Sequence, residues 1–137
     1  MCTSFKVELL KGIHNFTAAS NVFKLALYTN SASFNATTTA YTSGNEVSGT
    51  NYTAKGNAIT TVTPTSSSTT AFVDANDVVF SNVTISAVRG ALFYNEAASG
   101  DPTVAVLDFG SDKAASAGDF TVVMPTGDAS NAIIRIA

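Results

Sequence analysis

Apolar residues near the start of the chain recur at the spacing of one helix face. Between residues 4 and 16 the positions i, i+4, i+8 and i+11 are apolar, and they are Phe5, Leu9, Ile13 and Phe16. The pattern predicts an amphipathic helix over residues 4–16, with Phe5, Leu9 and Ile13 packed against the protein's own sheet. Gly12 costs about 1 kcal/mol inside a helix, so the C-terminal end of this helix is its weaker end.

Beyond Asn21 the helical period gives way to short runs of β-branched and aromatic residues. The predicted strands cover residues 22–29, 58–63, 78–80, 84–93, 103–109, 120–124 and 133–136. Turn-forming residues separate them, most clearly at 81–82, 95–101, 110–118 and 125–131, and the hydroxyl run 65–70 is typical of a turn or loop. The chain is therefore predicted to be mainly β, a jelly-roll-like β-sandwich of about seven or eight strands over residues 21–137. Its length favours a single domain, residues 1–137.

The composition of the chain changes this picture in one respect, its low charge. Only 12% of the 137 residues are charged, and Ser and Thr together make up about a quarter of the chain. Such a surface suits a protein that spends its life largely covered by others. The net charge of −3 and the absence of a basic run argue against binding to nucleic acid. No apolar stretch is long enough for a membrane span, and none near the start resembles a signal peptide, so we expect folding in a cytoplasm.

Side chains that carry out catalysis or bind metals are scarce. One Cys and one His exclude an internal disulfide and a zinc site built on these residues. Asp74 and Asp77 begin like a calcium loop, but Val78 occupies the next ligand position and no Glu closes the loop. We expect His14 to be a partly exposed structural residue. The sequence thus predicts no catalytic, metal or cofactor site, and a protein that is not an enzyme.

The tyrosines leave one binding function open. With nearby Asn and Asp, four tyrosines could line a sugar-binding face: Tyr28, Tyr41, Tyr52 and Tyr94. Tyr41 and Tyr52 lie in the polar middle of the chain and are the best candidates for exposure. Tyrosine at strand positions more often packs in the core or across strands. Both interpretations stand at this point.

Several segments of the chain resemble a known group of proteins. They are residues 23–29, 40–41, 46–56 (EVSGTNYTAKG), 80–87, 90–94 and 107–110. Together they are similar to a family of small proteins encoded among the structural genes of tailed bacteriophages. The most specific segment is 46–56, in which the family pattern places glycine where this chain has Asn51 and Lys55.

The resemblance implies a virion structural protein, most simply a capsid decoration (cement) protein on the outer head surface that stabilises contacts between major capsid proteins. The expected partners are the major capsid protein and copies of the chain itself, as a dimer or trimer on the shell, with synthesis in the bacterial host cytoplasm. Loops and strand edges of residues 42–70 hold few apolar side chains, so we expect recognition there. The predicted partner-binding residues are Tyr41, Glu46, Tyr52 and Lys55. A tail or tail-tip protein that binds a glycan receptor is the alternative.

Overall fold

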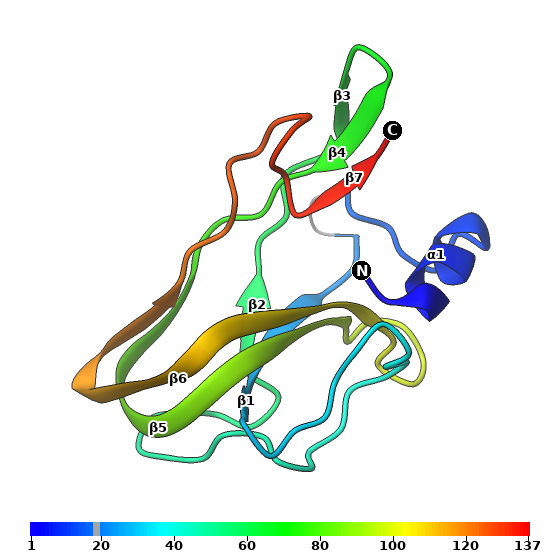
Figure 1. Ribbon diagram of the computed structural model, residues 1–137. Helices are drawn as coiled ribbons and strands as arrows, with labels where there is room; N and C mark the ends of the chain where they lie inside the picture. Colours follow the sequence, from blue (N-terminus) through cyan, green and yellow to red (C-terminus); the bar gives the residue numbers. More distant parts are fainter. Residues whose placement is uncertain (18–19) are drawn as a thin grey trace.

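A computed structural model describes residues 1–17 and 20–137, and it is mainly β, as predicted (Figure 1). In these described residues, one short helix precedes seven strands, which form two antiparallel sheets. The elements are α1 (Thr3–Leu10), β1 (Phe23–Thr29), β2 (Asn57–Ile59), β3 (Thr65–Ser67), β4 (Thr70–Val73), β5 (Val78–Asn95), β6 (Thr103–Val122) and β7 (Ile134–Ile136). No helix in the described residues is long and apolar enough to cross a membrane.

The N-terminal helix is shorter than the predicted range 4–16, because α1 ends at Leu10. Gly12 adopts a φ of 72°, a left-handed conformation that stops the helix. Phe5 is buried as predicted, but Ile13 is 40% exposed and does not anchor the helix. Phe16 is buried beyond the helix, with its ring stacked at 4.4 Å on Phe23 of β1. The apolar spacing therefore reflected a helix followed by an extended segment.

The larger sheet has the strand order β2-β1-β5-β6. β1 lies between β2 and β5, pairing Leu25 with Asn57 on one side and with Phe93 on the other. A strand with neighbours on both edges and cover on both faces is buried throughout, and β1 is buried at five of its seven positions. This explains the nearly continuous apolar run that predicted it.

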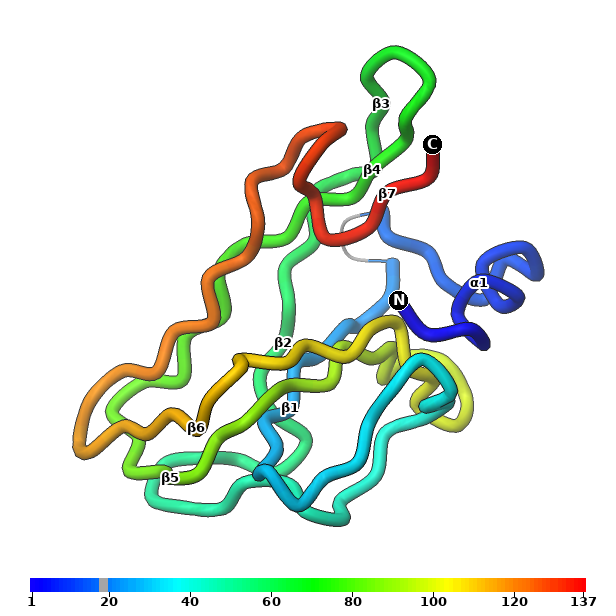
Figure 2. Tube along the Cα trace, viewed as in Figure 1, coloured from blue at the N-terminus to red at the C-terminus, as the bar shows by residue number. Residues whose placement is uncertain are grey.

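β5 and β6 form one long hairpin that bends sharply in the middle, as Figures 1 and 2 show at the left of the molecule. The residues 81–82 and 110–118, predicted to be turns between strands, instead lie within β5 and β6. These residues form β-bulges, which are seen as shifts in the register of the β5–β6 pairing between Phe80 and Gly90. Asn82 and Ala117 have positive φ at these shifts. The turn-forming residues therefore bend a continuous pair of strands.

The bend allows one hairpin to cover the core from two sides. Val83 and Ile85, near the corner of β5, belong to the same buried cluster as Leu27 of β1. The segment between β1 and β2 closes this cluster with Val47, whose backbone nitrogen donates to the Leu27 carbonyl at 2.9 Å. The main core thus lies between the larger sheet and the folded-over part of the hairpin.

The smaller sheet, with the order β3-β4-β7, lies near the C-terminus (Figure 2), and Val73 of β4 and Ile134 of β7 join the same buried cluster. The run 65–70, predicted to be a turn or loop, instead contains β3 and the start of β4, with the connection at Ser68. All three residues of β3 are exposed. The hairpin of β3 and β4 therefore projects from the body of the protein.

Candidate functional site

The four residues predicted to bind a partner lie together in the structure, around the carboxylate of Glu46. Its Oε2 accepts a hydrogen bond from the Tyr41 hydroxyl at 2.6 Å. Its Oε1 accepts bonds from the Tyr52 hydroxyl at 2.8 Å and from the Lys55 backbone nitrogen at 2.7 Å. We call Tyr41, Glu46, Tyr52 and Lys55 the clasp, because the Glu46 carboxylate links residues from both ends of the polar segment 41–56.

The clasp is attached to the larger sheet by its tyrosines. The Tyr52 hydroxyl accepts a bond from the Leu27 backbone nitrogen at 2.9 Å, and its ring stacks on Phe80 at 5.6 Å. Tyr41 stacks on the buried Tyr94 at 5.0 Å. Burial raises the pKa of Tyr41 and Tyr52, and the Glu46 carboxylate adds to the shift. Both phenols are therefore neutral donors to Glu46 over the ordinary pH range.

Two glycines allow the clasp segment to approach the sheet closely. A Cβ at Gly49 would lie 2.1 Å from the Thr84 carbonyl oxygen, and one at Gly56 would lie 1.9 Å from the Leu25 carbonyl oxygen. Gly56 also has a φ of 68°. No other residue fits either position without moving the backbone. The glycines of segment 46–56 are thus required by packing against β5 and β1.

The two positions where the family pattern places glycine also have left-handed backbone. Asn51 has a φ of 60° and Lys55 a φ of 75°. Asparagine tolerates this conformation, whereas lysine is strained in it by about 1–2 kcal/mol. Both positions thus have a backbone conformation that glycine would favour, although neither residue is glycine.

Segment 46–56 also supports the corner of β5. Thr50 exchanges backbone hydrogen bonds with Thr84 at 3.1 and 3.2 Å. Asn51 Nδ2 donates to the Asn82 carbonyl at 2.8 Å, and the Asn82 nitrogen donates to Asp119 Oδ1 at 2.8 Å. The backbone polar groups of the bulge at Asn82 are thus hydrogen-bonded by segment 46–56 on one side and by β6 on the other.

Lys55 carries the exposed part of the clasp. Its side chain is 43% exposed, and its ammonium lies 3.3 Å from Asp101, 3.6 Å from Glu96 and 5.7 Å from the Tyr41 ring centroid. Lys24 pairs with Glu96 at 2.9 Å, and its ammonium lowers the pKa of that carboxyl group. Most of the polar atoms that Tyr41, Glu46 and Tyr52 offer are directed at one another. A partner would therefore meet mainly Lys55 and the acidic groups around it.

The prediction that His14 is partly exposed is wrong, because its side chain is fully buried beside Phe5 and Phe16. Its Nε2 lies 2.9 Å from Glu8 Oε2, and its Nδ1 lies 3.2 Å from Asn95 Nδ2. Since the amide nitrogen of Asn95 donates, Nδ1 accepts and Nε2–H donates to Glu8. A kink after α1 turns the histidine inward, and the sequence pattern gave no signal for that.

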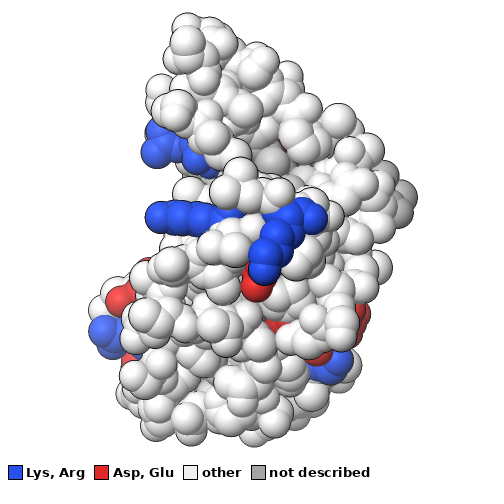
Figure 3. Space-filling model, turned by 90° about the vertical axis from the view of Figure 1, so that its right-hand side faces the viewer, with Lys and Arg blue, Asp and Glu red and all other residues white. Residues whose placement is uncertain are grey.

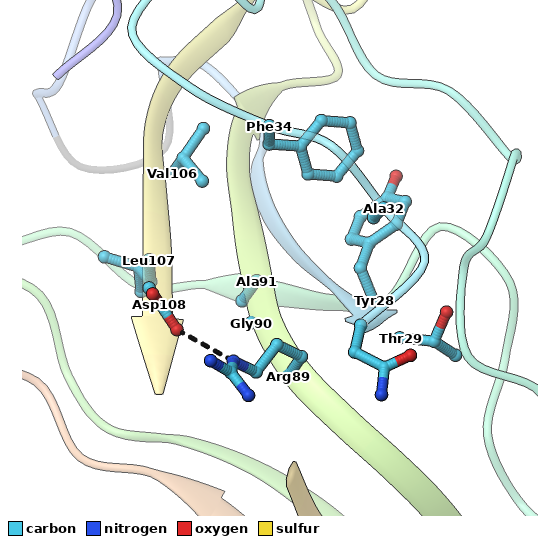
Figure 4. Close-up of a pocket in the computed structure, with 11 residues that line it drawn as sticks. Tyr28, Thr29, Ala32, Phe34, Arg89, Gly90, Ala91, Val106, Leu107 and Asp108 are labelled. Atoms are coloured by element: carbon cyan, nitrogen blue, oxygen red, sulfur yellow. Dashed lines mark hydrogen bonds and ion pairs between the residues drawn. The ribbon is translucent and has the colours of Figure 1, made fainter. Parts of the chain in front are cut away.

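A pocket that the sequence did not predict lies between β1, β5 and β6 (Figure 4). It has a volume of about 340 Å³, and Phe34 and Arg89 stand on opposite sides of it. Arg89 Nε lies 3.3 Å from Asp108 Oδ1, and its Nη1 lies 3.5 Å from Asp112 Oδ1. Two carboxylates therefore neutralise the one cation of this pocket. Residues from three distant segments form it, so local sequence offered no signal.

In the described residues, the remaining candidate Asp and Tyr side chains make structural hydrogen bonds. Asp77 Oδ1 accepts a bond from the Met124 nitrogen, and Asp74 Oδ1 accepts one from the Ala75 nitrogen, both at 2.8 Å. Within residues 1–17 and 20–137 no group of three or more His, Cys, Asp or Glu side chains could hold a metal ion. Tyr28 and Tyr94 are buried, and their hydroxyls donate to backbone carbonyls. These two tyrosines do not offer a sugar-binding surface.

Comparison with known proteins assigns no relative. A scan against models of protein families, a search of curated proteins and a search of solved structures each found no match.

Proposed function

We propose that the protein is a structural component of a tailed bacteriophage particle, a decoration or cement protein that binds the outer surface of the capsid. The observation that carries the proposal is the backbone of segment 46–56, the segment with the most specific resemblance to phage structural proteins. Its backbone is left-handed at Asn51 and Lys55, where the family pattern places glycine. Glycine favours this left-handed conformation, so the backbone at these two positions is compatible with the pattern and supports the proposal.

The surface supports the same proposal. Only 12% of the residues are charged, and most of the face in Figure 3 is uncharged apart from the basic side chains across its middle and smaller charged groups near its edges. Uncharged hydroxyl and amide groups cost less to desolvate than charged groups when a neighbouring protein covers them. A cement protein needs such contacts on more than one side, because it joins neighbouring shell subunits. In this proposal the clasp provides one contact, centred on Lys55.

We also propose that the body of the protein is a jelly-roll-like β-sandwich. The folded-over hairpin of β5 and β6 contributes buried side chains to both sides of the main core, which supports this interpretation. A rigid two-layered body would hold the clasp and the projecting hairpin of β3 and β4 at fixed positions relative to each other. Copies would meet as a dimer or trimer on the shell, where open strand edges are shielded.

The test uses DNA-filled, tailless heads of the phage that encodes the chain, prepared from a strain in which the gene is deleted. Purified protein should co-sediment with these heads and saturate at many copies per particle, and cryo-electron microscopy should place it on the outer shell. Density only in the tail, at a few copies per particle, would instead assign the protein to the tail or tail tip. Binding to neither heads nor tails would refute a virion role.

A further inference from the structure

A second surface of the protein has the properties of a docking site, and it is formed by α1. Val7 and Leu10 are one helical turn apart and are 50% and 90% exposed. Ile13, just beyond the helix, is 40% exposed. We call Val7, Leu10 and Ile13, together with Lys6 and Lys11, the α1 face. Three neighbouring aliphatic side chains on an eight-residue helix and its end form an apolar patch that the protein's own core does not use.

An apolar cleft adjoins this face. Leu9 lines it from α1, while Phe72 of β4 and Ile136 of β7 line it from the smaller sheet, in a volume of about 230 Å³. Ile136 is itself 53% exposed. The cleft gives a partner side chain a place to insert beside the helix, so the α1 face is more than a scatter of exposed residues.

The charge of the α1 face is opposite to that of the whole chain. Lys6 and Lys11 make no ion pair within the described residues, while Lys24, Lys55 and Arg89 are all paired. The one acidic residue of α1, Glu8, bonds to the buried His14. Figure 3, which views the side bearing α1, shows basic side chains gathered across its middle. Two unpaired lysines thus flank the apolar patch on a chain with a net charge of −3.

From this arrangement we infer that the α1 face binds an acidic protein surface with an apolar centre. This inference rests on the proposed function, which makes that surface part of the shell. Aliphatic side chains of the partner would cover Leu10 and enter the cleft, and its Asp and Glu side chains would pair with Lys6 and Lys11. With the clasp on another part of the molecule, the protein would have the two separate contacts that a cement protein needs.

Two other occupants fit the α1 face less well. A second copy bound through the same face would bring Lys6 and Lys11 of both copies together, and like charges repel across such a symmetric interface. A membrane fits poorly because an eight-residue helix buries few apolar side chains, and two lysines add little attraction to anionic lipids.

The first experiment tests the chemistry of the face independently of any phage. The full ¹⁵N-labelled chain is titrated with a synthetic peptide of alternating Glu and Leu, and with a Lys and Leu peptide of equal length. We expect amide shifts at residues 3–13 and near Phe72 and Ile136 with the acidic peptide alone, decreasing at high salt. Equal shifts with both peptides, or shifts elsewhere, would overturn the inference, as would a preference for anionic lipid vesicles over the acidic peptide.

The second experiment uses substitutions with matched controls. Leu10→Ser and Lys11→Glu alter the α1 face, whereas Val123→Ser and Lys113→Glu make the same changes elsewhere, at a 73% exposed valine and at a lysine without an ion pair in the described residues. All four variants should keep the melting temperature of the wild type. Each α1 variant should bind the acidic peptide and the tailless heads about tenfold more weakly, the effect of losing one good contact.

The outcomes separate this inference from the proposed function. If heads bind all four variants as well as the wild type, the α1 face is not the contact, and the proposed function stands. If the wild type binds no heads but the acidic peptide shifts the α1 face, the docking chemistry stands, and the capsid role fails. If Leu10→Ser converts an oligomer to a monomer in sedimentation equilibrium, the face binds a second copy, and the inference is wrong.

Discussion

Removing the Glu46 carboxylate should destabilise the protein strongly. The carboxylate accepts three hydrogen bonds, from Tyr41, Tyr52 and the Lys55 backbone. A bond to a charged group contributes roughly 1.5–3 kcal/mol, and the lower value applies because Glu46 is partly exposed and its bonds share one acceptor group. Glu46→Ala should therefore lower the free energy of unfolding by up to about 4.5 kcal/mol.

Glu46→Gln separates the hydrogen bonds from the charge. The glutamine oxygen can replace Oε1 and accept from Tyr52 and Lys55, while its amide nitrogen donates to the Tyr41 hydroxyl. Because every group keeps a partner, we expect a loss of only about 1 kcal/mol. The two substitutions should thus differ severalfold although both remove the charge.

The assay is urea unfolding at neutral pH, compared at equal m-values. Asp112→Ala serves as control, because it removes a carboxylate from an exposed ion pair with Arg89 and should cost less than about 1 kcal/mol. Tyr52→Phe in the Glu46→Ala background should cost less than in the wild type. If Glu46→Ala unfolds within about 0.5 kcal/mol of the control, the clasp does not hold segment 41–56 and the reasoning is refuted.

Three further predictions concern pH and single substitutions. Burial raises the pKa of all four tyrosines, so their contribution to stability should be complete below their unfolded-state pKa of about 10. Above that pH, the free energy of unfolding should fall by roughly 1.4 kcal/mol per pH unit for each tyrosine, which alkaline unfolding would measure. Tyr41→Phe should reduce this slope, and an unchanged slope would contradict the prediction. Gly56→Ala should prevent folding, because the added Cβ would clash with the Leu25 carbonyl oxygen. Gly100→Ala, at a φ of 85° in open space, should lower the free energy of unfolding by about 1 kcal/mol, and Lys55→Gly should hardly change it. Thermal melts would compare the three variants. His14→Ala should cost about 2–4 kcal/mol in urea unfolding, since it leaves a cavity and removes the hydrogen bonds of His14 to Glu8 and Asn95. A loss below about 1 kcal/mol would show that the network is dispensable.

The sequence predicted the fold best where local pattern and final environment agree. The central strand β1 lies within one residue of its predicted range, because burial on both faces requires an apolar run. The corner of β5 and β6 was not predicted. Ser81 and Asn82 favour a turn, and the same residues also form a bulge in a continuous strand. Only the distant pairing partner decides between the two, and it leaves no local signal.

For the clasp, the sequence grouped the four residues in one polar region but did not predict their arrangement, and their role in binding a partner stays a prediction. Tyr41, Glu46, Tyr52 and Lys55 are close together in the chain and polar, which indicated one functional region. That three donors converge on Glu46 depends on the fold of the whole segment. The α1 face was not predicted either, because Leu10 lies off the apolar stripe and its 90% exposure appears only once Gly12 ends the helix.

The bent hairpin of β5 and β6 also has a consequence for how the chain folds. Its pairing starts at Tyr94 and Thr103, next to the connecting loop, and proceeds outward to Val78 and Val122. Each new pair closes only a small additional loop, so both strands can zip together before β1 arrives from far along the chain. The corner then forms early and without β1. Slow folding steps should belong to the docking of β1 and of segment 41–56, and Glu46→Ala should slow folding more than substitutions at the exposed Val123.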